Sequence, residues 1–472
     1  MLNDILGFSV ILLYTIGCFF VSLYIYVHYA HIKERDFIYS SIYKTFIIMG
    51  FTIPAVVLFI IPIDKLCKTD MRRNDFGFEF DLELPLKVSM FFLLFCFFAN
   101  IFARIFYNQS LNVGLRTRFF RAGRVTLLSV LAYLVMMAFT YFLYNNGIIF
   151  RTTLVLGPFL LIGSFLFSVI GGVGLAALPL RFFQSLKDVK NRPTAEEIVL
   201  GKQVLLEENK RILKLASSVN DLQVEIEVTK HSNRKEAAMK KVTARERAEQ
   251  VRIEYTLFDE FYRSYKESLP SKDRQIVTEF SNFFIGLGGS FFSVYIFLGV
   301  IAGIFGFHDL LDYPLENTNI FIASTLFLTL SLYMVSCMVK GIGLLSNILL
   351  KYMETYEFRI NGTWSDTFLM SLNVLFVAVL GQICFFSRFL PKFMFETVWS
   401  IVMKNIVKNV NGLNLLYNIK FFEIVFVVSF IMALLWSVNK PRNSQKIQDR
   451  INEKIRRLKA DKKKVSILQA KV

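Results

Sequence analysis

The sequence predicts an all-α membrane protein, a polytopic bundle of about nine transmembrane helices. Three observations predict this class. First, 54% of the 472 residues are hydrophobic and only 19% are charged, whereas soluble domains average roughly 45–50% and about 25%. Second, nine apolar runs have the roughly 20 residues needed to cross about 30 Å of hydrocarbon. Third, one long charged segment separates the fifth run from the sixth. A soluble fold of this length could not hide so much apolar surface from water.

The nine predicted spans follow one another with short connections, apart from the charged segment. We expect helices, because every backbone polar group in lipid must be satisfied within its own segment and the runs lack the alternation of barrel strands. The first run follows Asp4 and is too long for a signal peptide, so we expect an uncleaved span. The runs are Ile5–Ala30, Thr45–Ile63, Leu86–Tyr107, Val125–Tyr144, Leu154–Leu180, Phe280–Phe307, Ile320–Val339, Phe368–Phe386 and Phe421–Val438.

The distribution of basic residues favours an N-terminus outside and a C-terminus in the cytosol. His308–Asn319 has no Lys or Arg and would lie outside, as the positive-inside rule requires. The glycosylation sequons at Asn108 and Asn361 would then lie on the cytosolic side, and we expect them to be unused. The sequence does not distinguish the plasma membrane, a lysosome-like membrane and the endoplasmic reticulum as the location of the protein. The loop with the clearest cytosolic signature carries Arg116, Arg118, Arg121 and Arg124 without an acidic residue.

Composition divides the chain into four parts. We expect residues 1–180 to form spans one to five, 181–277 to form a cytosolic helical hairpin, 278–438 to form spans six to nine, and 439–472 to form a basic cytosolic tail. The segment 181–277 carries 20 basic and 16 acidic residues, and the tail carries 12 basic and 3 acidic residues. Such a tail is attracted to anionic lipid headgroups, and no nucleic-acid-binding module accompanies it.

Heptad spacing predicts that the charged insert is an antiparallel coiled-coil hairpin. The capping box Thr194-Ala-Glu-Glu197 predicts the start of the first helix. Residues 230–233 interrupt the pattern and predict the turn. The seams either pack against each other or pair with another subunit or a cytosolic partner, and both readings stay open. The first seam consists of Ile198, Leu205, Ile212, Leu215, Val219, Leu222 and Ile226, and the second of Val251, Tyr255, Phe258, Tyr262 and Tyr265.

Prolines inside spans predict kinks that could line a ligand pocket. Proline removes a backbone donor and leaves a carbonyl that must find another partner or face a cavity. Glycines in the fifth span indicate close helix packing or local unwinding. The candidate pocket or kink residues are Pro54, Pro62, Asp64, Pro158, Gly171, Gly174 and Pro179.

Charged residues near the ends of the spans are predicted to snorkel, with the charge at the interface and the stem along the apolar surface. We place Asp64, Arg104, Arg181, Lys340 and Glu423 in this group. An amphipathic segment, Met394–Val410, is predicted to lie on the outer interface or to fold over the bundle as a lid.

The sequence names no catalytic residue and no metal site. It carries no paired carboxylates within a span, no zinc-binding His pair and no phosphate-binding loop, so we expect a protein that is not an enzyme and needs no cofactor. Cofactor-binding residues are unknown from sequence. Five cysteines in 472 residues, four of them in predicted spans, predict no extracytoplasmic disulfide.

The layout of five spans, a coiled-coil loop, four spans and a charged tail resembles the limb-region-1-like membrane protein family. Two short motifs support the resemblance, Ile61-Pro62-Ile63-Asp64 and the run from Gly172 to Pro179 followed by Arg181. This family includes the lipocalin-interacting membrane receptor and a lysosomal membrane protein involved in cobalamin export. The resemblance implies a nine-span, non-enzymatic receptor or an accessory to transport and trafficking. A transporter or channel for a small or lipophilic solute is the alternative, and a homodimer is left open.

Overall fold

The computed structural model confirms an all-helical protein. It describes residues 2–31, 41–73, 83–107, 115–142, 151–190, 195–229, 272–307, 309–349, 358, 363, 365–395 and 397–439, with selected positions between 240 and 262. These residues form helices and no β-strand. A single isolated bridge joins Ala30 to Thr363, where the His31 amide donates to the Thr363 carbonyl at 2.9 Å.

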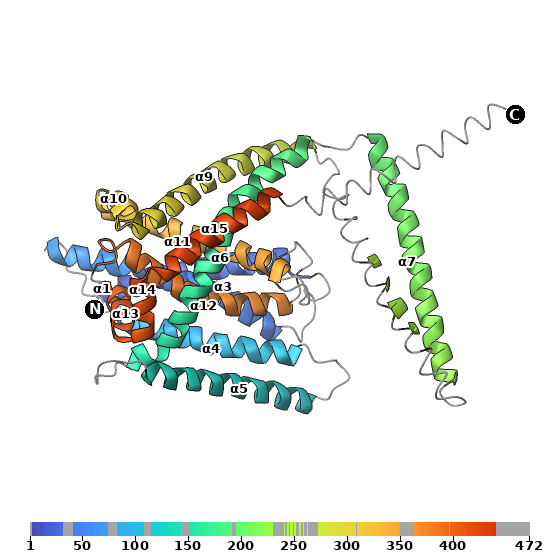
Figure 1. Cartoon of the computed structure of the whole chain (residues 1–472), viewed down its shortest axis with the longest axis horizontal. Helices are drawn as coiled ribbons and strands as arrows, with labels where there is room; N and C mark the ends of the chain where they lie inside the picture. Colours follow the sequence, from blue (N-terminus) through green and yellow to red (C-terminus); the bar gives the residue numbers. More distant parts are fainter. Residues whose placement is uncertain are drawn as a thin grey trace. The chain divides into compact units, whose positions relative to one another are not determined.

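The chain divides into two compact units, one of residues 1–182 and 284–438 and one of residues 183–283 and 439–472. Helix α7 (Ala195–Thr229) belongs to the second unit, and α6 and α9 cross from one unit to the other (Figure 1). The helices of the first unit are α1 (Leu2–Tyr29), α3 (Ser41–Arg73), α4 (Glu83–Tyr107), α5 (Leu115–Phe142), α6 (Arg151–Lys190), α9 (Lys272–Ile304), α10 (Asp309–Glu316), α11 (Ile320–Leu349), α12 (Ser365–Phe389), α13 (Val398–Asn409), α14 (Asn411–Asn418) and α15 (Phe421–Asn439).

Seven of the described helices are long and apolar enough to cross a membrane. They lie in α1, α3, α5, α6, α9, α11 and α12. The other two predicted spans correspond to shorter apolar stretches, residues 91–106 of α4 and 421–436 of α15. A multi-pass bundle is therefore confirmed, and the number nine stays a prediction.

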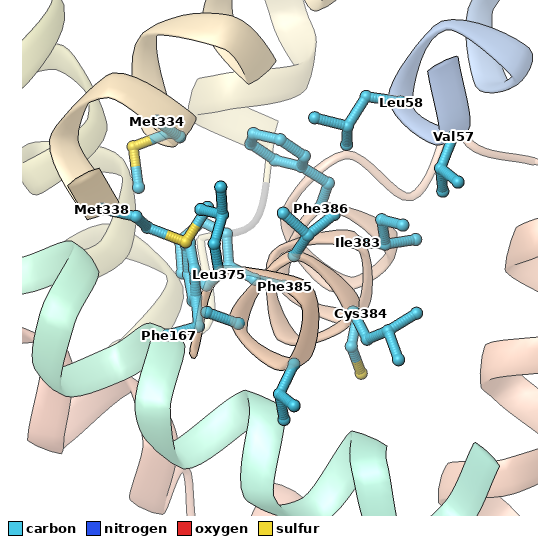
Figure 2. Packing of buried hydrophobic residues seen from close by; sticks show 14 of the residues in the cluster. Val57, Leu58, Phe167, Met334, Met338, Leu375, Ile383, Cys384, Phe385 and Phe386 are labelled. Carbon is cyan, nitrogen blue, oxygen red and sulfur yellow. The ribbon is translucent and has the colours of Figure 1, made fainter. Parts of the chain in front are cut away.

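Helix α12 forms the centre of the first unit. In its most apolar stretch 89% of the residues are buried, against 11% in α1 and 6% in α5, which lie at the periphery. Figure 2 shows Phe385 and Phe386 of α12 among side chains of α3, α6 and α11. The rings of Phe385 and Phe167 are 5.1 Å apart and those of Phe385 and Phe426 are 5.5 Å apart, so aromatic packing joins α12 to α6 and α15.

Glycines bring α6 into backbone contact with its neighbours. A Cβ atom at Gly174 would collide with the Cys337 carbonyl of α11, and one at Gly163 would collide with the Val377 carbonyl of α12. At Gly172 a Cβ atom would meet the Phe426 carbonyl of α15 at 2.6 Å. Small residues let membrane helices approach this closely and gain packing energy that lipid does not supply.

In the second unit, α7 buries one side. Leu205 and Ile212 are buried, and Leu215, Val219, Leu222 and Ile226 are half-buried, whereas the burial of Ile198 lies outside the described residues. Residues of the predicted first seam thus share the less exposed face of α7, as a helical period requires.

Two ion pairs show in which direction the segment containing Lys240 and Glu254 runs along α7. Arg211 pairs with Glu254 at 3.4 Å, and Glu225 pairs with Lys240 at 3.5 Å. The step from 211 to 225 is 14 residues forward, and the step from 254 to 240 is 14 residues backward. The two segments therefore run in opposite directions, and the coiled coil itself stays a prediction.

The side chains of the predicted second seam differ in exposure. Tyr255 is 58% exposed and Tyr262 is 47% exposed, whereas Ala244 is buried and Val251 and Phe258 are half-buried. Exposed tyrosines at the edge of a seam are compatible with either pairing, within the hairpin or with a partner, so the second seam stays a prediction. Tyr265 lies outside the described residues.

Candidate functional site

Three segments that the sequence predicts to be outer loops meet at one end of the first unit. They are the end of α3 at Asp64, helix α10, and the segment from residue 390 to the end of α13. We call α10, residues 390–395, Thr397 and α13 the cap. Figure 1 shows α13 and α14 beside each other at that end, with α10 at the same end of the bundle.

Asp64 holds the start of α13. Its side chain is buried, and its Oδ2 accepts a hydrogen bond from the Val398 amide at 2.6 Å. Thr397 caps the same helix through its hydroxyl, which accepts from the Ser400 amide at 3.2 Å. A carboxylate at a helix N-terminus is favoured by the helix dipole and satisfies a free amide. The prediction that Asp64 snorkels is therefore wrong, because a backbone donor inside the fold binds it.

Asp312 fixes the segment before α13. Its carboxylate is fully buried and accepts from the Lys392 amide at 2.6 Å and from the Phe393 amide at 3.1 Å. Burial raises the pKa of Asp312, and the two amide donors oppose that rise by stabilising the charged form. Lys65 adds two hydrogen bonds of 3.3 Å to the carbonyls of Lys392 and Phe395. The carboxylates of Asp64 and Asp312 and the ammonium group of Lys65 thus hold residues 392–395 and the start of α13.

The amphipathic segment Met394–Val410 packs into the bundle. Trp399, Met403 and Ile406 are buried, as are the hydroxyl side chains of Thr397 and Ser400. A helix lying flat on an interface would expose those two hydroxyl side chains. The geometry therefore fits the folded-over alternative, with the hydroxyl of Thr397 used for capping.

A cluster of polar groups is buried between α12, α14 and α15. Arg388 pairs with Glu423 at 2.8 Å, and the side chain of Glu423 is only 4% exposed. Arg388 also donates to the Tyr417 carbonyl at 2.7 Å and lies 5.5 Å from the centre of the Tyr417 ring. We call Arg388, Tyr417 and Glu423, with the residues that Tyr417 contacts, the buried polar cluster. The prediction that Glu423 snorkels is wrong, because the Arg388 guanidinium pairs with its buried carboxylate inside the fold.

Tyr417 connects this cluster to α6. Its hydroxyl lies 2.7 Å from the Ser164 hydroxyl and donates to the sulfur of Cys384 at 2.8 Å. Lys420 follows in the left-handed backbone region, with φ of 56°, and donates to the carbonyls of Gly303 and Ile304 at the end of α9. Helices α6, α9, α12 and α14 are thereby joined by polar contacts near the cap.

A second ion pair lies at the opposite end of α12. The Arg104 guanidinium of α4 contacts Asp366 at 2.7 Å and donates to the sulfur of Met370 at 2.9 Å. Both charged side chains are partly buried, at 27% and 21% exposure. Arg104 therefore pairs with protein, which corrects the prediction that it snorkels. The burial of Arg181 lies outside the described residues.

Asn100 is a buried polar residue one turn before Arg104. It is fully buried, and neither atom of its side-chain amide has a hydrogen-bond partner among the described residues. An unsatisfied buried amide is costly and needs a physical explanation, such as a role in binding. Sequence reasoning missed Asn100, although an Asn in the middle of an apolar run is a visible signal.

All seven candidate pocket or kink residues are buried, and they lie on two helices. Helix α3 continues through Pro54 and Pro62, and α6 continues through Pro158 and Pro179. Asp64 binds the cap. Gly171 would present a Cβ atom 3.4 Å from the rings of Phe167 and Phe426, and Gly174 lies against α11, so both glycines serve close packing. A pocket at these residues stays a prediction.

Within the described ranges, no three His, Cys, Asp or Glu side chains are placed to hold a metal ion. Cys18, Cys96, Cys337 and Cys384 are free thiols. The chemistry available in the cap and the buried polar cluster is ion pairing and hydrogen bonding.

Replacing Asp64 by alanine is expected to destabilise the cap. The variant leaves the Val398 amide without its acceptor at a buried helix start, which costs about 2 kcal/mol. Thermal unfolding of the purified chain in detergent measures the loss, and Asp64→Asn, which keeps one acceptor oxygen, should lose less. Equal melting temperatures for wild type and Asp64→Ala would show that the hydrogen bond does not stabilise the cap.

Fold and site together define a multi-pass α-helical membrane protein whose connecting segments fold back on the bundle. The chain is 26% identical over 286 residues to a LIMR family protein from Dictyostelium discoideum, with 58% of this chain and 52% of that protein covered. This similarity confirms the limb-region-1-like (LIMR) resemblance, and the chain spans about half the length of that relative. No family model matches the chain. No solved structure matches it either.

Proposed function

We propose that this protein is a non-enzymatic receptor or transport and trafficking accessory protein of the LIMR type, which binds a cytosolic protein through residues 181–277. The similarity to a LIMR family protein and the multi-pass bundle support a membrane role. A soluble insert between spans is a feature that a plain carrier does not need.

The observation that carries this proposal is an exposed apolar stripe on α7. The steps between its members are 7, 11 and 4 residues, so helical periodicity puts them on one face. This face lies away from the buried seam of Leu205 and Ile212. The stripe consists of Leu206, Leu213, Val224 and Val228, with exposed fractions of 53%, 61%, 56% and 71%. An apolar stripe rimmed by charged residues is typical of a surface that a partner covers.

Two charges placed on this stripe should abolish partner binding. We expect the double variant Leu213→Glu, Val224→Glu to recover the partner about tenfold less well than wild type, because a charge in the apolar centre of an interface costs more than 1 kcal/mol. The measurement is quantitative mass spectrometry of proteins that copurify with the full-length chain from membranes.

The matched control is Gln203→Glu, Gln223→Glu, which adds the same charge to exposed polar positions of α7. It should recover the partner as well as wild type does. Equal recovery with the stripe variant, or no protein enriched by wild type over an unrelated multi-pass protein, would contradict the proposal.

Close packing in the bundle supports an accessory role over a conduit. The glycines of α6 place its backbone directly against α11, α12 and α15. Such contacts leave no room for a solute between these helix pairs. The buried polar cluster, with the Arg388–Glu423 pair, then acts to orient the helices beneath the cap.

The alternative function, transport of a small or lipophilic solute, is favoured by Asn100 and by two further unsatisfied amide oxygens. An amide without partners between apolar helices could hydrogen-bond a passing solute or water. Two further buried acceptors, Oε1 of Gln382 and Oδ1 of Asn373, have no partner within the described part of the chain. These groups would line a path along α4 and α12.

The variant Asn100→Leu separates the two functions. For an accessory protein we expect it to be more stable than wild type by about 1–2 kcal/mol, because an unsatisfied amide is replaced by an apolar group of similar size. Partner binding should not change. For a transporter, wild type reconstituted alone would carry solute into proteoliposomes and Asn100→Leu would not. Solute flux that the variant abolishes would therefore refute the accessory role.

The proposal includes a location and further partners. The N-terminus is outside and the C-terminus is cytosolic, in the plasma membrane or an endomembrane, and the basic tail binds anionic lipid headgroups. No cofactor, metal or nucleic acid takes part. A homodimer through the seam of α7 is compatible with this role.

A further inference from the structure

Helix α5 is the least buried candidate span. It packs on α4 along one side, where Ala122 is fully buried and the Tyr133 ring lies 5.8 Å from the Phe98 ring. The other side is apolar and exposed. Its members follow one another at steps of 8, 3, 4 and 7 residues, which helical periodicity puts on one face. They are Phe120 at 63%, Leu128 at 65%, Leu131 at 50%, Val135 at 69% and Phe142 at 83% exposure. In a bilayer this side of α5 faces lipid.

Three arginines lie on this lipid-facing side at the start of α5. Arg116 and Arg124 are one turn before and one turn after Phe120, and Arg121 flanks them. All three are exposed, and no carboxylate pairs with them within the described residues. The Arg116 guanidinium lies 5.8 Å from the centre of the Phe120 ring, which keeps it on this face. The fourth arginine, Arg118, differs from these three because it is half-buried and already has an interaction within the protein.

The axial positions match the layers of a bilayer. At 1.5 Å per residue, Arg116 and Arg124 are about 12 Å apart along the helix, which is the scale of a headgroup layer. The 18 residues from Val125 to Phe142 then span about 27 Å, close to the hydrocarbon thickness. Arg124 would thus lie at the boundary between headgroups and acyl chains.

We propose that this face of α5 is a binding site for an anionic phospholipid, with its phosphates held by Arg116, Arg121 and Arg124 and an acyl chain along Leu128, Leu131 and Val135. Guanidinium groups bind phosphate through two parallel hydrogen bonds, which lysine cannot do. Three of them spread over about 12 Å fit a headgroup with more than one phosphate better than a single phosphodiester. This site is separate from the basic tail and from the α7 surface, and it does not rest on the proposed receptor role.

The test is retention of lipid by the full-length chain. Delipidated protein is reconstituted in nanodiscs of phosphatidylcholine alone, with added phosphatidylserine, or with added phosphatidylinositol bisphosphate, and lipid that survives detergent exchange is quantified by native mass spectrometry. We expect wild type to retain the bisphosphate lipid preferentially. The variant Arg116→Gln, Arg121→Gln, Arg124→Gln should retain at least about tenfold less, and the triple Arg→Lys variant should lie between them.

The variant Lys202→Gln, Lys210→Gln, Lys214→Gln removes the same charge from exposed positions of α7 and should retain lipid as wild type does. Each variant must match wild type in size-exclusion profile, and the Arg→Lys variant tests the site if the Gln variant fails to fold. Undiminished retention by the variants of α5, loss through the α7 variant instead, or equal retention of phosphatidylcholine would overturn the proposal. Equally tight binding of free inositol trisphosphate in detergent would assign the site to a soluble phosphate compound.

Discussion

Alanine at Gly174 is expected to destabilise the bundle by about 3 kcal/mol, near the upper end for an overpacked core. The added Cβ atom would overlap the Cys337 carbonyl of α11, which is backbone and cannot rotate away. Helices α6 and α11 must then separate along their shared face, and the loss spreads to the neighbouring contact between Gly341 and the Ile170 carbonyl. Thermal unfolding in detergent, read by intrinsic fluorescence and by aggregation, measures the effect.

Gly288 of α9 is the matched control for this prediction. A Cβ atom there meets nothing within 4 Å, so Gly288→Ala should leave the melting temperature unchanged or raise it, as expected for alanine in a helix. The close approach of α6 to α11 would be refuted if Gly174→Ala melted at the same temperature as Gly288→Ala.

Methionine at Arg388 is expected to cost about 3–5 kcal/mol, because it leaves Glu423 charged, buried and without its partner. The pair is 2.8 Å long, and Glu423 is 4% exposed. The double variant Arg388→Met, Glu423→Leu removes both charges and should recover most of that loss, since an apolar pair of similar volume replaces a buried ion pair at little cost. The free energy of unfolding of the three chains gives the coupling.

The exposed ion pair of the cap, Lys392 with Glu316, is the control for the buried Arg388–Glu423 pair. Lys392 and Glu316 are 2.8 Å apart but 49% and 45% exposed, so Glu316→Gln should change stability by less than about 1 kcal/mol. An Arg388→Met variant no less stable than Glu316→Gln would mean that the buried polar cluster does not hold α12, α14 and α15 together.

The positions of the helices could be predicted from the sequence, because run length and apolar composition are local properties. Each of the nine predicted runs overlaps one helix, and the seam residues of α7 share one face. The boundaries differ where polar residues continue a helix beyond the apolar run. Helix α6, for example, extends from Arg151 to Lys190, well beyond Leu180.

The partners of the charged residues could not be predicted, because they lie far apart in the sequence. Asp64 and Val398 are separated by 334 positions, and Arg104 and Asp366 by 262. Without a fold, a charge near the end of a span is expected to seek the interface. The central position of α12 could not be predicted either, because α1 and α12 are both apolar and differ mainly in the residues that surround them. The partners of the charged residues and the burial of α12 depend on tertiary contacts, which a local sequence pattern does not show.

The most direct test of the central claim is the sidedness of α7 and α13. Between them lie three helices that are long and apolar enough to cross a membrane, α9, α11 and α12. We therefore expect single cysteines at Lys214 and Lys404, in a chain without its native cysteines, to lie on opposite faces. In sealed microsomes an impermeant maleimide should label only one of the two, and both should react once the membrane is permeabilised. Labelling of both, or of neither, before permeabilisation would contradict the multi-pass arrangement described above.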